Sequence, residues 1–457
     1  MHALIALASA ASLDQLEVGG LYGTPTDTGA TAVWWSPGAL AGDTGFRSHI
    51  EVAGLDATMS FTRSGPGGGQ DIYLERGALP YAGLAWGKDL GGAGHLGIGA
   101  ALVVPQVRGG TSTVENGPGR WAMEKGRIQA LYGLGAIAYR PHPAIGVGLI
   151  GGVIDSSWTA RSDKDTMPDL GHAIEREGGT NTYTDEMLED DDYAVQLDFQ
   201  LKDTALTGGF GVWVQPHDRV RISATYIHGA RVDNTGPVTM RFNCPTQTDT
   251  VGRFATEKQG LCDADVNSTA SVSYRLPPRV HGGVSFDATE TLRIEALGGW
   301  VGWSRYDDFD IAVTDPVSEN SELSESAVES ITEAHPWARD NKDAAWGAID
   351  IKGQPIPWIT LGGRVAYDSA AVPTHALSPN NYDANTWMLS GLVAGHPGRW
   401  TVGLSYTHFL AQDRTVTDSS YYNSIESPPE TRWNYSQSAG TYEGDIRRAA
   451  LVVRFEQ

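Results

Sequence analysis

The chain of 457 residues carries 33 Lys and Arg against 55 Asp and Glu, so its formal net charge at pH 7 is −22. Such an acidic chain lacks the basic surface that nucleic-acid binding requires, and we expect no nucleic-acid partner. Beyond the first residues, no run of about 18 uncharged apolar residues occurs, which argues against a membrane-spanning helix. The strands of a membrane β-barrel alternate in polarity and give no such run, so a barrel remains open.

Two segments precede the first clear strand pattern. Residues 1–11 are apolar and end in small residues, as signal-peptide cleavage sites do, although no basic segment stands before them. We interpret them as the remnant of a secretory signal. Residues 12–44 are rich in Gly, Thr and Ala and show no sustained alternation, which predicts an irregular plug.

From residue 45 to residue 457, stretches of alternating polarity are separated in turn by very short connections and by long polar loops. Bacterial outer-membrane barrels are built in this way, with tight turns on the periplasmic side and long loops outside. The pattern predicts an all-β, transmembrane antiparallel barrel of about 14 strands, an even number as single-chain barrels require. The short connections lie near residues 88–94, 140–143, 215–218, 287–290, 353–357 and 395–398.

The two faces of several predicted strands can be assigned. Leu404 and Tyr406 alternate with Ser405 and Thr407, and similar patterns occur near residues 220–226, 359–368 and 451–455. In a barrel the apolar face contacts lipid and the polar face lines the lumen. Aromatic residues near strand ends fit interfacial girdles. They are Trp358, Trp400, Tyr226 and Tyr367.

Two predicted loops, at about 161–203 and 314–340, hold most of the excess negative charge. Solvated loops are the simpler interpretation, and a divalent-cation site bridging to lipopolysaccharide phosphates is the alternative. Cys244 and Cys262 fall in one further loop, and we expect a disulfide between them because the compartment permits oxidation. A metal pair would need nearby His or further Cys.

Motifs for cofactors and catalysis give no support to an enzyme. Residues 146–151 spell G-x-G-x-x-G, but strand-like residues follow where a dinucleotide site needs a helix. The sequence contains no H-E-x-x-H zinc motif and no G-x-S-x-G elbow. We therefore expect no cofactor, no metal and no enzymatic activity.

Several segments resemble those of one family, in the family's order along the chain. Within residues 30–40, Ser36-Pro37-Gly38 resembles a hatch motif that reads Asn-Pro-Ala, with Ser in place of Asn and Gly in place of Ala. The family is that of the FadL/TodX outer-membrane transporters of long-chain fatty acids and aromatic hydrocarbons. Further similar segments are Leu96 to Pro105, Gly119-Arg120-Trp121, Leu276-Pro277-Pro278, Trp303 to Tyr306, Tyr367 to Pro373 and Val453-Arg454-Phe455.

The resemblance implies a barrel in the bacterial outer membrane, over residues 45–457, with residues 12–44 as a hatch inside its lumen. It implies passive uptake of a hydrophobic small molecule or fatty acid by a monomer, among outer-membrane lipids and lipopolysaccharide. A kink in the third strand would open the wall for lateral release into the membrane. Gly97, Gly99 and Pro105 are the residues that could weaken strand pairing there.

Candidate ligand-binding residues follow from the chemistry of an amphiphile. Burying an alkyl chain contributes about 0.8 kcal/mol per CH₂, so the pocket needs apolar walls and one cation for an acidic head. Plug packing and ion pairing are the alternative roles for these residues. The apolar candidates are Val33, Trp34, Trp35 and Leu40, and the cationic candidates are Arg221, Arg293 and Arg364.

Two rival functions stay open at this point. A general diffusion porin for polar solutes would lack the plug and would carry a constricting loop with opposed charges. An outer-membrane barrel hydrolase would need a Ser/His or Asp/His set at one membrane edge. His228 and His408 occupy late strand positions where such a set could form.

Overall fold

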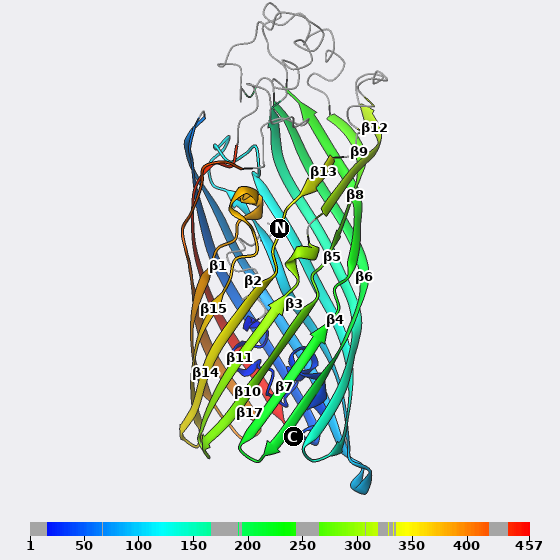
Figure 1. Cartoon of the computed structure of the whole chain (residues 1–457), viewed down its shortest axis with the longest axis vertical. Coiled ribbons are helices and arrows are strands. Elements are labelled where there is room, and N and C mark those ends of the chain that lie inside the picture. Colours follow the sequence, from blue (N-terminus) through cyan, green and yellow to red (C-terminus); the bar gives the residue numbers. More distant parts are fainter. Residues whose placement is uncertain are drawn as a thin grey trace, which may run out of the picture.

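The computed structural model describes residues 16–65, 67–165, 191, 194–243, 265–306, 308–318, 328, 332, 335–419 and 437–457. All their strands belong to one antiparallel sheet, which closes because β1 (Gly45–Arg63) pairs with both β2 (Gly69–Asp89) and β19 (Gly440–Glu456). The molecule is a tall closed barrel (Figure 1), as the sequence predicts.

The wall contains 14 strands, as predicted, although several are interrupted. The continuous ones, besides β1, β2 and β19, are β3 (His95–Ser112), β4 (Lys125–His142), β5 (Ile145–Asp165), β6 (Ala194–His217), β15 (Ile359–Asp368) and β16 (Thr386–Gly395). The interrupted ones are β7 (Val220–Ile227) with β8 (Arg231–Phe242), β9 (Asp265–Arg275) with β10 (Arg279–Thr289), β11 (Leu292–Val301) with β12 (Asp308–Ser318), β13 (His335–Ala338) with β14 (Ala344–Ile356), and β17 (Trp400–Ala411) with β18 (Arg414–Val416). Pro277 and Pro278 explain one interruption, because proline cannot donate to a strand ladder.

Short turns and long loops lie at opposite ends of the barrel, which we name the turn end and the loop end. The turns join β2 to β3, β4 to β5, β6 to β7, β10 to β11, β14 to β15 and β16 to β17. Their positions are those that the sequence predicts.

Outward-facing side chains form an apolar belt around the wall. Leu404 and Tyr406 of β17 are 61% and 51% exposed, whereas Ser405 and Thr407 face the lumen and are buried. At the turn end, the ring of Trp400 lies 4.9 Å from that of Phe455. Near the loop end, Tyr367 packs on Trp387 at 5.0 Å. An apolar band between aromatic girdles is typical of membrane barrels.

No helix among the described residues is long and apolar enough to span a membrane.

The belt predicts a lipid-facing position for Leu404. We expect Leu404→Arg to destabilise the barrel in bilayers by about 2–4 kcal/mol, because the charge would enter hydrocarbon. The measurement is the urea midpoint of folding into lipid vesicles, followed by heat-modifiable mobility in SDS gels. The control is Thr58→Arg. Thr58 also faces outwards, but it stands beside Asp445 and lies beyond the belt towards the loop end. Equal midpoints for the two variants would contradict the orientation.

Residues 16–44 lie inside the lumen, towards the turn end, and form the hatch (Figure 1, dark blue). The hatch contains three short helical turns, η2 (Gly20–Tyr22), α1 (Ala32–Trp35) and η3 (Pro37–Ala41), and most of its residues are buried. Pro37 at the start of η3 suits a helix N-terminus, since its missing N–H would have no partner there.

Lumen-facing glycines form a seat for the hatch on one side of the wall. A Cβ atom at Gly148 of β5 would stand 2.4 Å from the carbonyl carbon of Pro37, and one at Gly97 of β3 would stand 2.4 Å from that of Leu40. Only a residue without a side chain allows this approach of two backbones. Packing against the hatch thus explains Gly146 and Gly148, the first two glycines of the G-x-G-x-x-G run at 146–151. Gly99 and Gly211 leave room for the side chains of Val33 and Pro37.

The glycine seat predicts an effect for one of two neighbouring substitutions and none for the other. Gly148→Val should displace the hatch and cost about 1–3 kcal/mol through overpacking. We expect higher ion conductance in planar bilayers and faster proteolysis of residues 16–44. A Cβ atom at Gly151 meets nothing within 4 Å, so Gly151→Val on the same strand is the matched control. The seat is refuted if both variants conduct like the unmodified protein.

Candidate functional site

On the loop side of the hatch, the lumen is lined by apolar and aromatic side chains. They form one continuous hydrophobic cluster that begins at the hatch and includes side chains from wall strands on all sides of the barrel. Water-filled porins have a polar interior instead. Representative lining residues are Met59, Phe61, Tyr73, Val103, Trp158, Val272, Phe309, Met388, Phe409 and Ile446.

Trp35 of the hatch is anchored to the wall. Its indole N–H donates to the carbonyl of Val18 at 2.8 Å, and its own carbonyl accepts the hydroxyl of Thr225 at 2.9 Å. Its ring lies 4.9 Å from that of His281. Trp35 therefore holds the hatch in place, which is the packing role left open for it above.

Trp34, the neighbouring candidate, is fully buried and faces a cationic and aromatic group. Its ring lies 5.8 Å from Tyr132 of β4 in an edge-to-face arrangement, and the guanidinium of Arg279 lies 5.0 Å above it. Arg279 donates to the hydroxyl of Tyr132 at 3.2 Å. Arg279 belongs to β10 and Tyr132 to β4, so this bond crosses the lumen above the hatch.

Arg279 is a buried cation without a carboxylate partner among the described residues. It is 1% exposed, and its Nε and Nη1 atoms have no hydrogen-bond partner there. The indole N–H of Trp34 and Nδ1 of His281 also lack partners in this part of the chain. Nε2 of His281 donates to the carbonyl of Trp35, so its Nδ1 is an acceptor. Buried polar groups are normally satisfied, so the unused donors of Arg279 and Trp34 indicate a site for an acceptor or an anion.

The three predicted cations lie elsewhere and are already paired. Arg364 donates to both carboxylate oxygens of Asp350 at 2.7 and 2.6 Å. Arg293 and Arg221 both reach Asp287, at 2.6 and 3.2 Å, close to a turn. All three face the lumen as predicted, but none offers a free guanidinium to a ligand.

Charged wall side chains fix the hatch on the side opposite its glycine seat. Arg364 donates to the carbonyl of Leu16 at 2.5 Å, and Arg448 binds the Glu17 carboxylate at 2.6 Å. Asp27 of the hatch reaches Arg454 at 3.4 Å. Burial raises the pKa of Asp27, but Arg454 and further cations outweigh that effect and leave the pKa below its ordinary value. The carboxylate is therefore ionised at neutral pH.

The remaining predicted hatch residues take packing positions. Val33 and Leu40 contact the glycine seat and are fully buried. Ser36 is also buried, and its hydroxyl has no hydrogen-bond partner among the described residues. Gly38 fits against backbone oxygens of Gly146 and Gly211, so a side chain there would clash.

The wall is unpaired at one place between β2 and β3. Pairing stops at Tyr81 with Val103 and resumes at Leu74 with Thr111, so residues 75–80 and 104–110 do not face each other in the ladder. β3 bulges against β4 between Val103 and Gln106, a stretch that includes Pro105. Both strands stay paired to their other neighbours here. We name this place the unpaired segment.

Of the three residues predicted to open the wall, only Pro105 lies at the unpaired segment. Gly97 and Gly99 are paired, with Gly87 and Ala85 of β2. Their absence of side chains makes room for the hatch rather than weakening the strand ladder.

The loop between β15 and β16, residues 369–385, folds into the loop end of the lumen, and we name it the cap loop. It contains η8 (Thr374–Ala376) and η9 (Pro379–Asn381). Leu377 is fully buried, and Asn380 donates to the carbonyl of Ala122 in the β3–β4 loop at 3.3 Å. The described lumen therefore has the hatch at one end and the cap loop near the other (Figure 1).

Two predictions, the disulfide and the acidic loops, concern residues that lie wholly or partly outside the described ranges. Cys244 and Cys262 lie outside the described residues, and so does most of both acidic loops. Within the part of the chain that the structure describes, no group of three or more His, Cys, Asp or Glu side chains could hold a metal ion.

No protein-family model matches the chain, and no curated protein sequence matches it.

Solved structures do match, over nearly the whole chain. A FadL homologue of Pseudomonas aeruginosa is 14% identical, with 99% of each chain covered and a TM-score of 0.75. The P. putida toluene transporter TodX is 11% identical, again with 99% of each covered and a TM-score of 0.65. The Ralstonia pickettii toluene transporter TbuX is 15% identical over 94% of each chain, with a TM-score of 0.58. At such identities the similarity is one of fold, and the chain has the barrel fold of the FadL and TodX proteins.

Proposed function

We propose that this chain carries out passive outer-membrane uptake of hydrophobic compounds, such as long-chain fatty acids or related lipids and hydrocarbons. The apolar lumen between hatch and cap loop carries the proposal, because hydrophobic surface facing a lumen suits an apolar cargo and not a hydrated one. The fold shared with a FadL homologue and two toluene transporters supports it.

The proposed route leaves the lumen sideways. The hatch blocks the turn end, whereas the unpaired segment lies on the loop side of Tyr81 in the wall. A ligand released there enters the membrane without crossing the hatch. No nucleotide or ion gradient is needed, since transfer into the bilayer gains roughly 0.8 kcal/mol per CH₂ relative to water.

For the head group of an amphiphile, the candidate anchor is Arg279. A carboxylate would satisfy the unused Nε and Nη1 donors and could replace the Tyr132 hydroxyl. The cargo we favour is accordingly an apolar chain with an acidic head.

Both rival functions fit less well. A porin for polar solutes conflicts with the apolar lumen and with a hatch tied to the wall on two sides. For a hydrolase, His408 pairs with Asp445 at 2.6 Å, and His228 bonds the hydroxyl of Tyr226 at 2.9 Å. Neither ring contacts a serine hydroxyl in the described hydrogen bonds.

Uptake by whole cells tests the proposed function. Bacteria that lack their own outer-membrane route for long-chain fatty acids should accumulate radiolabelled oleate or toluene faster when they express this chain. Uptake of a polar sugar and ion conductance should stay at the level of vector controls, because the hatch and apolar lumen exclude water. Raised sugar flux without any gain for the hydrophobic compounds would favour the porin.

Substitution of Arg279 tests the anchor. Arg279→Met should weaken binding of oleate to the purified protein at least about tenfold, because a charge-assisted hydrogen bond is lost. Binding of oleyl alcohol should change little, and Arg293→Gln, another lumen-facing arginine, should leave both affinities unchanged. Equilibrium tryptophan quenching reports both ligands. An equal loss of affinity for oleate and for oleyl alcohol would show that Arg279 only supports the fold.

A further inference from the structure

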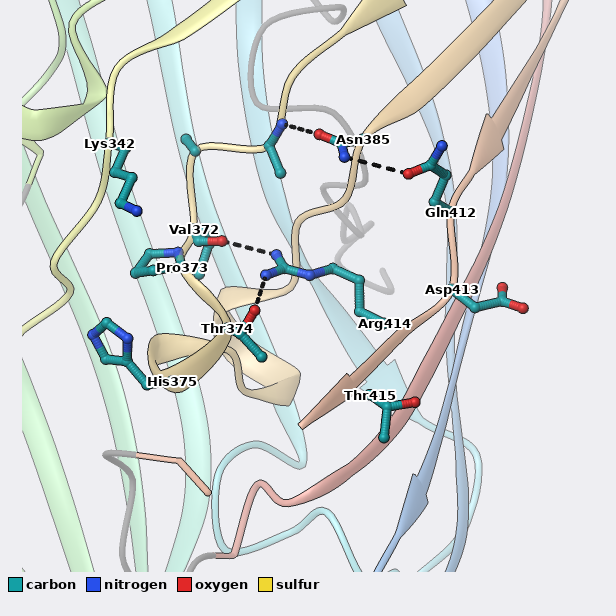
Figure 2. Close-up of a pocket in the computed structure, with 12 residues that line it drawn as sticks. Lys342, Val372, Pro373, Thr374, His375, Asn385, Gln412, Asp413, Arg414 and Thr415 are labelled. Atoms are coloured by element: carbon teal, nitrogen blue, oxygen red, sulfur yellow. Dashed lines mark hydrogen bonds between the residues drawn. The ribbon is translucent and has the colours of Figure 1, made fainter. Parts of the chain in front are cut away.

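A polar pocket of about 690 Å³ opens on the outer surface of the barrel, near the loop end. It lies where β15 and β16 have ended and the cap loop fills the wall between β14 and β18. Figure 2 shows Lys342 on one side of it, Arg414 and Thr415 on the other, and Val372 to Thr374 of the cap loop between them. We name this pocket the notch.

The notch stands directly above the apolar belt. Its residue Ala370 follows the girdle residue Tyr367 by three positions, Asn385 precedes Trp387 by two, and Gln412 follows the exposed Leu410 by two. Aromatic girdles mark the boundary between hydrocarbon and head groups. In the proposed outer membrane, the loop end faces outwards, so the notch lies at the level of the head groups of the outer leaflet.

Two cations, Arg414 and Lys342, line the notch. Arg414 donates to the carbonyls of Val372 and Asp383, each at 2.8 Å, and to the Thr374 hydroxyl at 3.0 Å, all neutral acceptors. Lys342 forms no ion pair among the described residues, and its ammonium group points towards the same cap-loop segment (Figure 2). The side chain of Asp413 is directed away from both cations in that view.

The third basic residue of the notch is His375, which pairs with Asp340 at 3.0 Å. The buried carboxylate of Asp383 offsets the charge of Arg414. Lys342 is therefore the notch cation for which the described residues provide no ion pair. Phosphate oxygens accept well from ammonium and guanidinium groups.

We propose that the notch binds the phosphorylated sugar head group of an outer-leaflet glycolipid, the lipid A part of lipopolysaccharide. This proposal rests on the outer-membrane location in the proposed function, but it does not depend on what passes through the lumen. The lipid places one phosphate against the ammonium group of Lys342, while its acyl chains lie along the apolar belt below. The notch is thereby an annular lipid site, separate from the transport route.

The test uses the full-length protein in non-ionic detergent, with native mass spectrometry as the readout. Bisphosphorylated lipid A should bind in a saturable way, and chemically dephosphorylated lipid A about tenfold more weakly, since one charge-assisted contact is lost. Lys342→Gln should weaken binding of the phosphorylated lipid to a similar degree, and Lys342→Arg should retain it. Lys88→Gln, an exposed lysine at the turn end, is the matched control.

Three results would overturn the proposal. One is equal affinity of Lys342→Gln and the unmodified protein for lipid A, with both correctly folded by heat-modifiable mobility. Another is equal affinity for the phosphorylated and dephosphorylated lipids. The third is displacement of lipid A by millimolar inorganic phosphate, which would identify a site for free phosphate. Cells that express Lys342→Gln should take up oleate as fast as cells that express the unmodified protein. Uptake therefore tests the transport proposal separately from lipid A binding.

Discussion

A backbone that crosses hydrocarbon must satisfy all its hydrogen bonds within the protein, and this constraint shapes the whole molecule. The chain meets it by pairing its first wall strand with its last, over seventeen residue pairs from Arg47 to Arg63. Closure leaves a lumen that has to be filled or sealed. The hatch seals it, and each side of the wall provides a different means. Glycines allow backbone contact on one side, and arginines bind a carbonyl and a carboxylate of the hatch on the other.

The lumen is consequently divided into two chemical zones. Around the hatch, ion pairs such as Arg364 with Asp350 occupy the turn end. Beyond the hatch, apolar and aromatic side chains dominate. The bond from Arg279 to Tyr132 lies at the border between the zones, and Tyr132 stands opposite Val103, the last paired residue of β3 below the unpaired segment. An amphiphile held at this border would have its head beside the hatch and its chain in the apolar zone, close to the unpaired segment.

Much of the fold could be predicted from local sequence, because alternation and turn chemistry are local properties. The short turns, the lipid-facing side of β17 and the number of wall strands are all readable in this way. The role of single glycines is not. The sequence predicts that Gly97 and Gly99 weaken a strand, yet they make room for a contact with Val33 and Leu40 more than fifty residues away. A glycine in the sequence does not indicate which neighbouring segment occupies the space that a side chain would fill.

Arg279, the proposed anchor, is not among the three cations that the sequence suggests, for a related reason. Arg279, Arg293 and Arg364 all occupy lumen-facing positions, and only the three-dimensional pairing of strands shows that two of them have carboxylate partners. Arg279, His281 and Ser285 alternate with the outward-facing Val280 and Val284. This alternation places Arg279 on the lumen side, and it is the sequence signal that could have identified the residue. Its partner Tyr132 is 147 residues away, beyond any local pattern.

The central claim is that an apolar ligand occupies the lumen between the hatch and the cap loop. Crystals grown with a long-chain fatty acid brominated at its chain end and at its middle would test this most directly. The claim predicts anomalous bromine peaks inside the barrel on the loop side of Trp34, with the carboxylate at Arg279. Bromine peaks confined to the outer wall, with none inside the barrel, would contradict it.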